Sequence, residues 1–224
     1  MKPFLHSPAV RMGLSISVAT GLYGISFGAL SVAAGLTFWQ TLVLSLLMYT
    51  GGSQFAFVGV IAGGGAPASA VGAATLLGVR NALYGMQLNA LLHVPGWLKP
   101  VAAQLTIDES TATAMAQTTP EEQRRGFWTA AIGVFIVWNV CTALGAWLGD
   151  ALGDPRRFGL DGAAVAAFLG LLWPRLRQRH AGAVAVVCAL VTVLAVPWLP
   201  PGLPILLAAA VAIIIGLRLR PEVG

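Results

Sequence analysis

Long apolar runs recur along the whole chain, and they constrain the fold more than any other feature of the sequence. Seven runs are separated by glycine, proline or charged residues: 12–35, 38–62, 68–92, 126–148, 160–173, 181–196 and 203–217. An α-helix of about 20 apolar residues crosses the hydrocarbon core of a bilayer, whereas membrane β-strands alternate apolar with polar residues. The sequence therefore predicts an all-α, polytopic membrane protein with about seven transmembrane helices.

The composition excludes an ordinary soluble domain. Only 9% of the residues are charged and 57% are hydrophobic, with a mean hydropathy of +0.81, whereas about 25% of the residues in a soluble domain are charged. Basic residues gather in loops, notably Arg175, Arg177 and Arg179 and the terminal Arg218 and Arg220. Positive loops face the cytoplasm, so the net charge of +5 indicates a multi-pass protein of the cytoplasmic (inner) membrane that contacts lipid and not nucleic acid.

One segment, residues 101–118, does not fit the apolar pattern. It carries Asp108, Glu109 and seven serine, threonine or glutamine residues, which are costly in lipid. A re-entrant or interfacial helix there gives seven crossings and an N-terminus outside, which is the interpretation we favour. A crossing buried in protein gives eight and an N-terminus inside. In either case we expect one membrane domain, residues 1–224, with this segment linking repeat halves 12–92 and 126–196.

Two adjacent glycines, Gly51 and Gly52, lie in the middle of the second run, Y-T-G-G-S-Q-F-A-F-V-G-V. Paired glycines favour an unwound stretch, and Ser53 beside them can cap a half-helix that restarts there. Broken helices offer free N–H groups to an anion and mark substrate sites in transporters. We therefore predict that Gly51, Gly52, Ser53 and Gln54 bind substrate; the alternative is that the glycines only let two helices pack closely.

The run 160–173 is short for a crossing and begins with Asp161 and Gly162. Aligned with the second run, it places Asp161-Gly162 at the position of the paired glycines. Under seven crossings, the two three-helix units have opposite orientations, which is the inverted-repeat plan of many secondary transporters. We predict two broken or short helices related in this way; a chance match of small residues is the alternative.

Arg80 lies inside the third run, T-L-L-G-V-R-N-A-L-Y-G. At 100° per residue it shares a face with Tyr84 and Gln87, beside a small and polar stripe that includes Asn81. A charge at the membrane centre costs at least about 2.5–3.5 kcal/mol, so this face must turn toward protein or a cavity. Arg80 is either a structural residue, paired with an acid or with broken-helix carbonyls, or a carboxylate-binding residue, together with Asn81 and Tyr84.

Asp108 and Glu109 form an acidic pair in mostly uncharged sequence. A carboxyl group in a low-dielectric setting titrates at higher pH and is able to carry a proton. We expect Asp108, Glu109 or Asp161 to couple transport to protons, unless the pair is simply solvated at the membrane surface. The chain has no P-loop or H-E-x-x-H motif, so we expect no enzyme activity, catalytic residue, cofactor or metal.

Four motifs together resemble one known family. They are T-G-G-S-Q-F-A-F, R-N-A-L-Y-G, T-I-D-E-S and G-L-D-G-A-A-V-A-A-F. In this order and spacing they resemble the AzlC family, the large subunits of two-component branched-chain amino-acid exporters, over nearly the whole chain. The resemblance implies a permease of seven or eight helices that works with a small hydrophobic AzlD-type membrane subunit.

The same resemblance implies export of leucine, isoleucine, valine and other apolar amino acids, driven by the proton gradient. One position departs from the family pattern: the arginine is commonly followed by histidine, whereas here it is followed by Asn81. A proton-carrying role for that histidine does not transfer, so proton coupling falls to the acidic residues. The alternative function is a passive channel for another small solute, which needs no coupling acid.

Overall fold

The computed structural model describes residues 7–152, 169, 173, 176–177 and 179–218. Within them the regular structure is entirely helical. The first five helices are α1 (Pro8–Gly21), α2 (Tyr23–Ala33), α3 (Phe38–Leu47), α4 (Gly52–Ala62) and α5 (Pro67–Leu92). A 3-10 turn, η2 (Gly96–Leu98), leads to α6 (Lys99–Gln104), α7 (Asp108–Met115) and α8 (Pro120–Leu152), and α10 (Arg179–Ala195) and α11 (Leu203–Arg218) follow.

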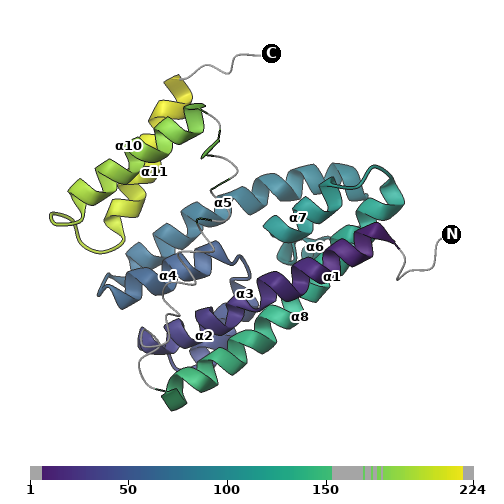
Figure 1. The fold of residues 1–224 in the computed structure, drawn as a ribbon, viewed down its shortest axis with the longest axis horizontal. Coiled ribbons are helices and arrows are strands. Elements are labelled where there is room, and N and C mark those ends of the chain that lie inside the picture. The colour runs from purple at the N-terminus through teal and green to yellow at the C-terminus, as the bar shows by residue number, and fades with distance from the viewer. Residues whose placement is uncertain (1–6, 153–168, 170–172, 174–175, 178, 219–224) are drawn as a thin grey trace.

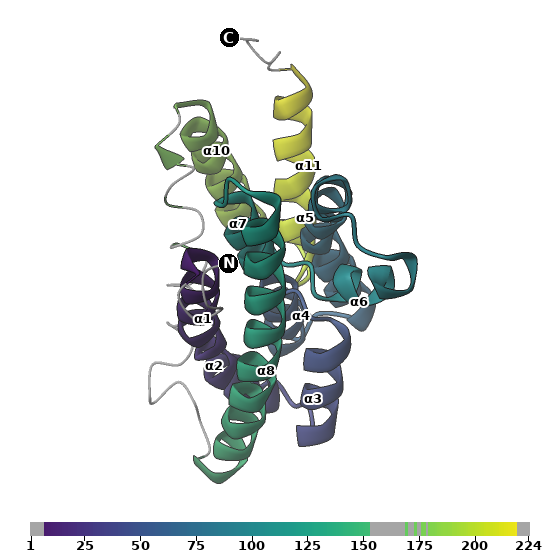
Figure 2. The same cartoon turned by 90° about the vertical axis from the view of Figure 1, so that its right-hand side faces the viewer.

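The fold is organised around α8, which has 33 residues. Figures 1 and 2 show α1 and α2 running along α8, with α3 and α7 also in contact with it. On the other side, α5 packs on α4, and the α10–α11 hairpin joins this part through α11 and α5. A cluster of Phe27, Phe55 and Trp138, with ring centroids 5.6–6.2 Å apart, fills the space between α2, α4 and α8.

Glycines allow the close approach of α2 to α8. A Cβ on Gly145 would lie 2.0 Å from the carbonyl oxygen of Ile25, and one on Gly28 would lie 2.1 Å from the carbonyl oxygen of Thr142. Both contacts are to backbone, which cannot rotate away as a side chain can. Small residues at helix crossings let backbones pack in this way, and in lipid such packing is a main source of helix association.

We expect Gly145→Leu to destabilise the protein by about 3 kcal/mol or more, because the two backbones must separate to admit the side chain. The matched control is Gly59→Leu, since Gly59 is a helical glycine with no heavy atom within 4 Å of its built Cβ. Thermal unfolding of the purified variants in detergent measures both. Equal midpoints for the two variants would contradict the close packing of α2 on α8.

Most expected apolar segments correspond to helices of the structure. Two helical stretches are long and apolar enough to cross a membrane on their own, Pro8–Ala33 and Pro120–Ala151. The first expected span corresponds to Pro8–Ala33, in which the single irregular residue Leu22 separates α1 from α2 and keeps helical backbone angles. The expected short helix that begins at Asp161-Gly162 lies outside the described residues, and with it the second half of the predicted repeat.

The polar segment 101–118 forms parts of two short helices, α6 of six residues and α7 of eight. At 1.5 Å per residue, α7 is about 12 Å long and cannot cross a hydrocarbon core of about 30 Å. It packs on α8 and also contacts α1 and α5. Helix α7 is therefore covered by protein on several sides, and the acidic residues in its first turn are partly buried.

Candidate functional site

The second apolar run is broken at the paired glycines, as predicted. Helix α3 ends at Leu47 and α4 begins at Gly52, with Gly51 at φ +57° between them. This backbone conformation is favourable for glycine and strained for most other residues. The break turns four residues, 48–51, into a non-helical link between two half-helices.

Gln54, rather than Ser53, caps the restarting half-helix. The Gln54 side-chain oxygen accepts a hydrogen bond from Gly51 N–H at 3.2 Å, while its amide nitrogen donates to the carbonyls of Leu44 and Ser45 at 3.5 and 3.4 Å. Gln54 is fully buried, and this conformation uses both ends of its amide within the broken helix. Its longer side chain reaches back to the end of α3, which the Ser53 hydroxyl does not.

The start of α4 keeps unused donors. Among the described residues, the Gly52 and Ser53 N–H groups have no hydrogen-bond partner. The Ser53 hydroxyl is also unpartnered, although Ser53 is only 1% exposed. Helix α5 passes directly over it, because a Cβ on Gly78 would lie 3.5 Å from Ser53 Oγ. The first turn of α4 thus offers N–H groups, a hydroxyl and the positive end of a helix dipole to an anion.

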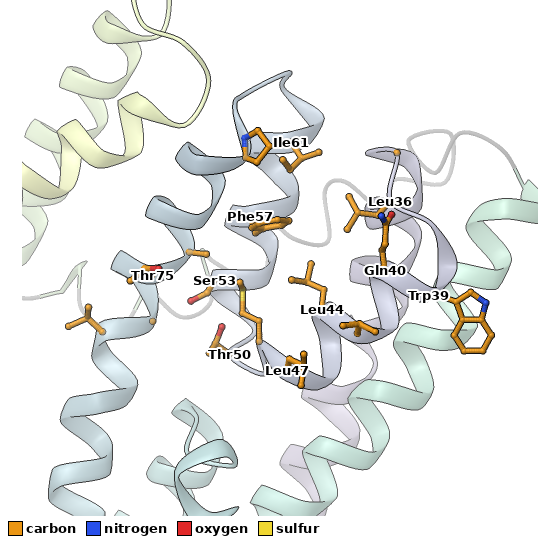
Figure 3. A pocket seen from close by; sticks show the side chains of 17 residues that line it. Leu36, Trp39, Gln40, Leu44, Leu47, Thr50, Ser53, Phe57, Ile61 and Thr75 are labelled. Atoms are coloured by element: carbon orange, nitrogen blue, oxygen red, sulfur yellow. The ribbon is translucent and has the colours of Figure 1, made fainter. Parts of the chain in front are cut away.

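An apolar groove opens beside this half-helix end. It has a volume of about 1130 Å³ and lies between α3, α4 and α5. Figure 3 shows Thr50, Ser53 and Thr75 on its α5 side and Leu36, Trp39 and Gln40 on its α3 side. The hydroxyls of Thr50 and Ser53 are buried without partners. The groove therefore joins a small polar end to a large apolar wall.

Arg80 forms an ion pair with one member of the acidic pair. Its Nη2 lies 2.9 Å from Asp108 Oδ2, and the two side chains are 28% and 21% exposed. The Arg80 Nε–H is buried and has no partner. The contact joins α5 to the first residue of α7. Arg80 thus holds α5 to α7 through Asp108. The Nε–H of its guanidinium remains available to bind a second anion.

Glu109 differs from its neighbour because it makes no ion pair among the described residues. Burial raises the pKa of its carboxyl above the usual range, and the Asp108 charge acts in the same direction. Its own backbone N–H, the Arg80 charge and a hydrogen bond from Thr20 oppose this rise in pKa. The two carboxyls therefore have different environments: Asp108 is paired with an arginine, while burial raises the pKa of Glu109.

Buried polar atoms without partners occur at the break and on the helices α5 and α7. Within the described part of the chain they include Tyr49 Oη, Thr50 Oγ1, Ser53 Oγ, Arg80 Nε, Asn81 Oδ1 and Thr111 Oγ1. Buried polar groups in native proteins are nearly always hydrogen-bonded, to protein, water or a ligand. This concentration of free donors and acceptors therefore indicates a place that receives water or a polar solute.

Two residues near Glu109, Tyr49 and Thr20, were not predicted from the sequence to belong to the site. Tyr49 precedes the break, is 4% exposed, and stacks edge-on against Phe135 at a centroid distance of 4.9 Å. The Glu109 charge acts on its phenol, which places the two groups near each other. Thr20, which bonds Glu109, lies just before the turn between α1 and α2. A hydroxyl beside a helix interruption was the available signal for both.

The predicted site residues do not all meet in one place. Asn81 lines a separate cavity of about 510 Å³ between α5, α6 and α8, together with Asn89 and Thr106. Tyr84 lies on the same helix and is partly buried. Asp161 lies outside the described residues. No group of three or more His, Cys, Asp or Glu side chains able to hold a metal ion occurs among the described residues.

Comparison with known proteins gives one match. A family model described as AzlC protein matches residues 15–152, which is more than half of the chain and runs from α1 to the end of α8. The matched part contains the broken helix, Arg80 and the acidic pair. No curated protein and no solved structure matches the chain.

Proposed function

The chain belongs to the AzlC protein family, and we propose that it is the large subunit of a secondary exporter. The family is associated with branched-chain amino-acid transport and is not a family of enzymes. The observation that carries the proposal is the cluster of unpartnered polar groups at a broken helix, next to an Arg80–Asp108 pair and Glu109. Broken helices of this kind hold substrate and coupling ions in secondary transporters.

The proposed arrangement in the membrane has seven crossings. These crossings are the seven apolar runs of the sequence, of which the run 160–173 lies almost wholly outside the described residues. Supporting it, α6 and α7 are each too short to cross. The protein is then a multi-pass protein of the cytoplasmic membrane, with residues 101–118 as a re-entrant segment that carries the coupling acids into the protein.

An apolar amino acid matches the two ends of the groove. Its carboxylate has two groups of donors available: the start of α4 with the Ser53 hydroxyl, and the guanidinium of Arg80. Its branched side chain has an apolar wall that includes Leu44, Phe57 and Val79. We place the carboxylate near the break and the side chain in the groove, because a polar group is then not left in contact with apolar residues.

We assign proton coupling to Glu109 and the positioning of Arg80 to Asp108. A coupling acid must change protonation during each cycle, which is easiest for a carboxyl not already neutralised by a fixed cation. Glu109 fulfils this condition, whereas Asp108 is held by Arg80 at 2.9 Å. The protein then exports substrate in exchange for external protons. Glu109 binds a proton from outside and releases it inside, and this inward proton movement drives the substrate outward.

The test is export from membrane vesicles loaded with labelled leucine. An imposed pH gradient is expected to drive substrate out against its own gradient, and an uncoupler that dissipates the pH gradient is expected to stop it. A passive channel for another solute, the alternative function, would only equalise concentrations whatever the pH gradient. Leucine movement that ignores the gradient would therefore exclude the exporter and favour the channel.

A further prediction concerns a small AzlD-type membrane subunit. The groove between α3, α4 and α5 leaves polar residues Thr50 and Ser53 beside an open apolar surface, and lipid chains cannot hydrogen-bond them. We expect cells that make this chain alone to export little or no leucine. Cells that also make the small hydrophobic protein encoded beside it should export. The control is the small protein alone, and full export by the present chain alone would contradict the two-subunit proposal.

A further inference from the structure

The end of half-helix α3 is held by a residue from the acidic segment. The last four carbonyls of any α-helix lack partners within the helix. In α3, the Leu44 carbonyl accepts from the Met48 N–H at 2.9 Å and from the Gln54 amide at 3.5 Å, and the Ser45 carbonyl accepts from the Gln54 amide at 3.4 Å. The final two, Leu46 and Leu47, accept from the side-chain amide of Gln104, at 2.9 and 3.2 Å. Gln104 lies 57 residues along the chain from Leu47 and makes the shorter bonds.

Gln104 is joined closely to the acidic pair. It is the last residue of α6, and three buried residues, Leu105, Thr106 and Ile107, connect it to Asp108. The Ser110 hydroxyl ties this link to α7, because it donates to the Leu105 carbonyl at 2.9 Å and accepts from Ile107 N–H at 3.0 Å. The link between Gln104 and α7 is thus short, buried and hydrogen-bonded to the first turn of α7.

A continuous set of contacts thus runs from α5 to the break. Arg80 bonds Asp108, the Ser110 hydroxyl fixes the start of α7 to the preceding link, and Gln104 bonds the end of α3. Each contact crosses from one element to the next. Any change of charge at Asp108 or Glu109 alters the first contact, and the chain of contacts ends where the two half-helices separate.

We infer that Gln104 is a positioning residue for transport: its amide holds the end of α3 at a place set by the Asp108–Glu109 segment, so that a proton bound or released there changes how the two half-helices meet. This inference rests on the proposed proton-coupled export. It gives Gln104 no contact with substrate. Its removal should separate two activities that the intact protein links, namely substrate movement and use of the pH gradient.

The experiment compares Gln104→Leu with wild type in membrane vesicles that contain the whole transporter. Gradient-driven export is measured beside exchange of internal labelled leucine for external unlabelled leucine without a gradient. We expect exchange per folded protein to change little. Gradient-driven export should fall about tenfold, as the loss of two hydrogen bonds at the coupling contact implies. The matched control is Gln123→Leu, since the Gln123 side-chain amide donates to the Gln117 carbonyl at 3.0 Å near the start of α8, outside the groove.

The outcomes separate the inference from the proposed function. If Gln104→Leu lowers both activities in parallel, or neither, Gln104 is only structural and the inference is wrong. If wild-type vesicles show exchange but no use of the pH gradient, the proposed coupling itself fails, and the inference fails with it. Should Gln104→Leu not accumulate, Gln104→Glu provides the test. Its ionised form cannot donate, so coupling relative to wild type at the same pH should be lost at high pH and regained as the carboxyl becomes protonated. A ratio of the two activities that follows wild type at every pH would overturn the inference.

Discussion

Arg80→Ala is expected to reduce export to background, the largest effect of any single change. The variant leaves Asp108 without the cation that lies 2.9 Å from it, and an uncompensated, partly buried charge costs about 3–5 kcal/mol. It also removes one of the two groups of donors available to the substrate carboxylate. Both losses act in the same direction, so the single variant measures their sum and does not separate them.

Arg80→Lys and a double variant distinguish the two roles. Lysine keeps the charge but lacks the planar fork of arginine, so a carboxylate-binding role predicts weaker substrate binding by about 1.5–3 kcal/mol, roughly ten- to a hundredfold. Arg80→Ala/Asp108→Asn removes both members of the pair. If Arg80 only supports Asp108, the double variant should recover export; such recovery would exclude Arg80 as the substrate anchor and leave the start of α4 in that role.

The control for this series is Arg125→Ala. Arg125 also forms ion pairs, with Glu121 at 2.6 Å and Glu122 at 3.1 Å, but at the beginning of α8 and away from the break. The Arg125 side chain is only 17% exposed, so its loss should cost stability much as the loss of Arg80 does, while export per folded protein should stay near wild type. Loss of export in this variant as well would mean that removal of any paired arginine disables the protein, and Arg80 would then have no specific role.

Glu109→Gln is expected to abolish gradient-driven export while leaving exchange of internal for external leucine. Glutamine has nearly the same shape as the protonated acid and cannot change charge, so the variant remains in one protonation state. Its transport should also lose its dependence on pH in the range where Glu109 titrates. The measurements are the same two vesicle assays, carried out across a series of pH values.

The direction of the pH effect follows from the raised pKa of Glu109. A carboxyl whose pKa is higher in the folded than in the unfolded protein binds more protons when folded. Its favourable contribution to stability is complete below the unfolded pKa and is lost as pH rises through the folded pKa. Wild type should therefore lose stability over that pH range and Glu109→Gln should not, as thermal unfolding at several pH values would show.

Asp108→Asn is the comparison that tests the division of roles between the two acids. Because Asp108 is already neutralised by Arg80, its amide variant should impair folding or binding through Arg80 without altering the pH dependence of what transport remains. If Asp108→Asn removes the pH dependence and Glu109→Gln keeps it, the assignment is reversed. If both keep it, the coupling acid lies elsewhere, and Asp161 is the next residue to change.

Several elements of this protein were predictable from the sequence because they depend on local composition. Apolar length predicted the segments that became α5, α8, α10 and α11, since a hydrophobic run of that length forms a helix in almost any packing. Gly51-Gly52 predicted the break, because only glycine tolerates the backbone angle found at Gly51. The T-G-G-S-Q, R-N-A-L-Y-G and T-I-D-E-S motifs led to the family that the match over 15–152 shows.

The pairing of distant groups was decided only by the tertiary structure. Sequence reasoning left Arg80 with three classes of partner, and the packing of α7 against α5 selected Asp108. It expected Ser53 to cap the half-helix, whereas the fold brings Gln54 and Gln104 to the free carbonyls of α3. Local pattern determines which residues form a helix, but a hydrogen bond or ion pair between segments depends on where the helices meet. That position is set by the sum of many small contacts, such as the glycines between α2 and α8, which no single motif contains.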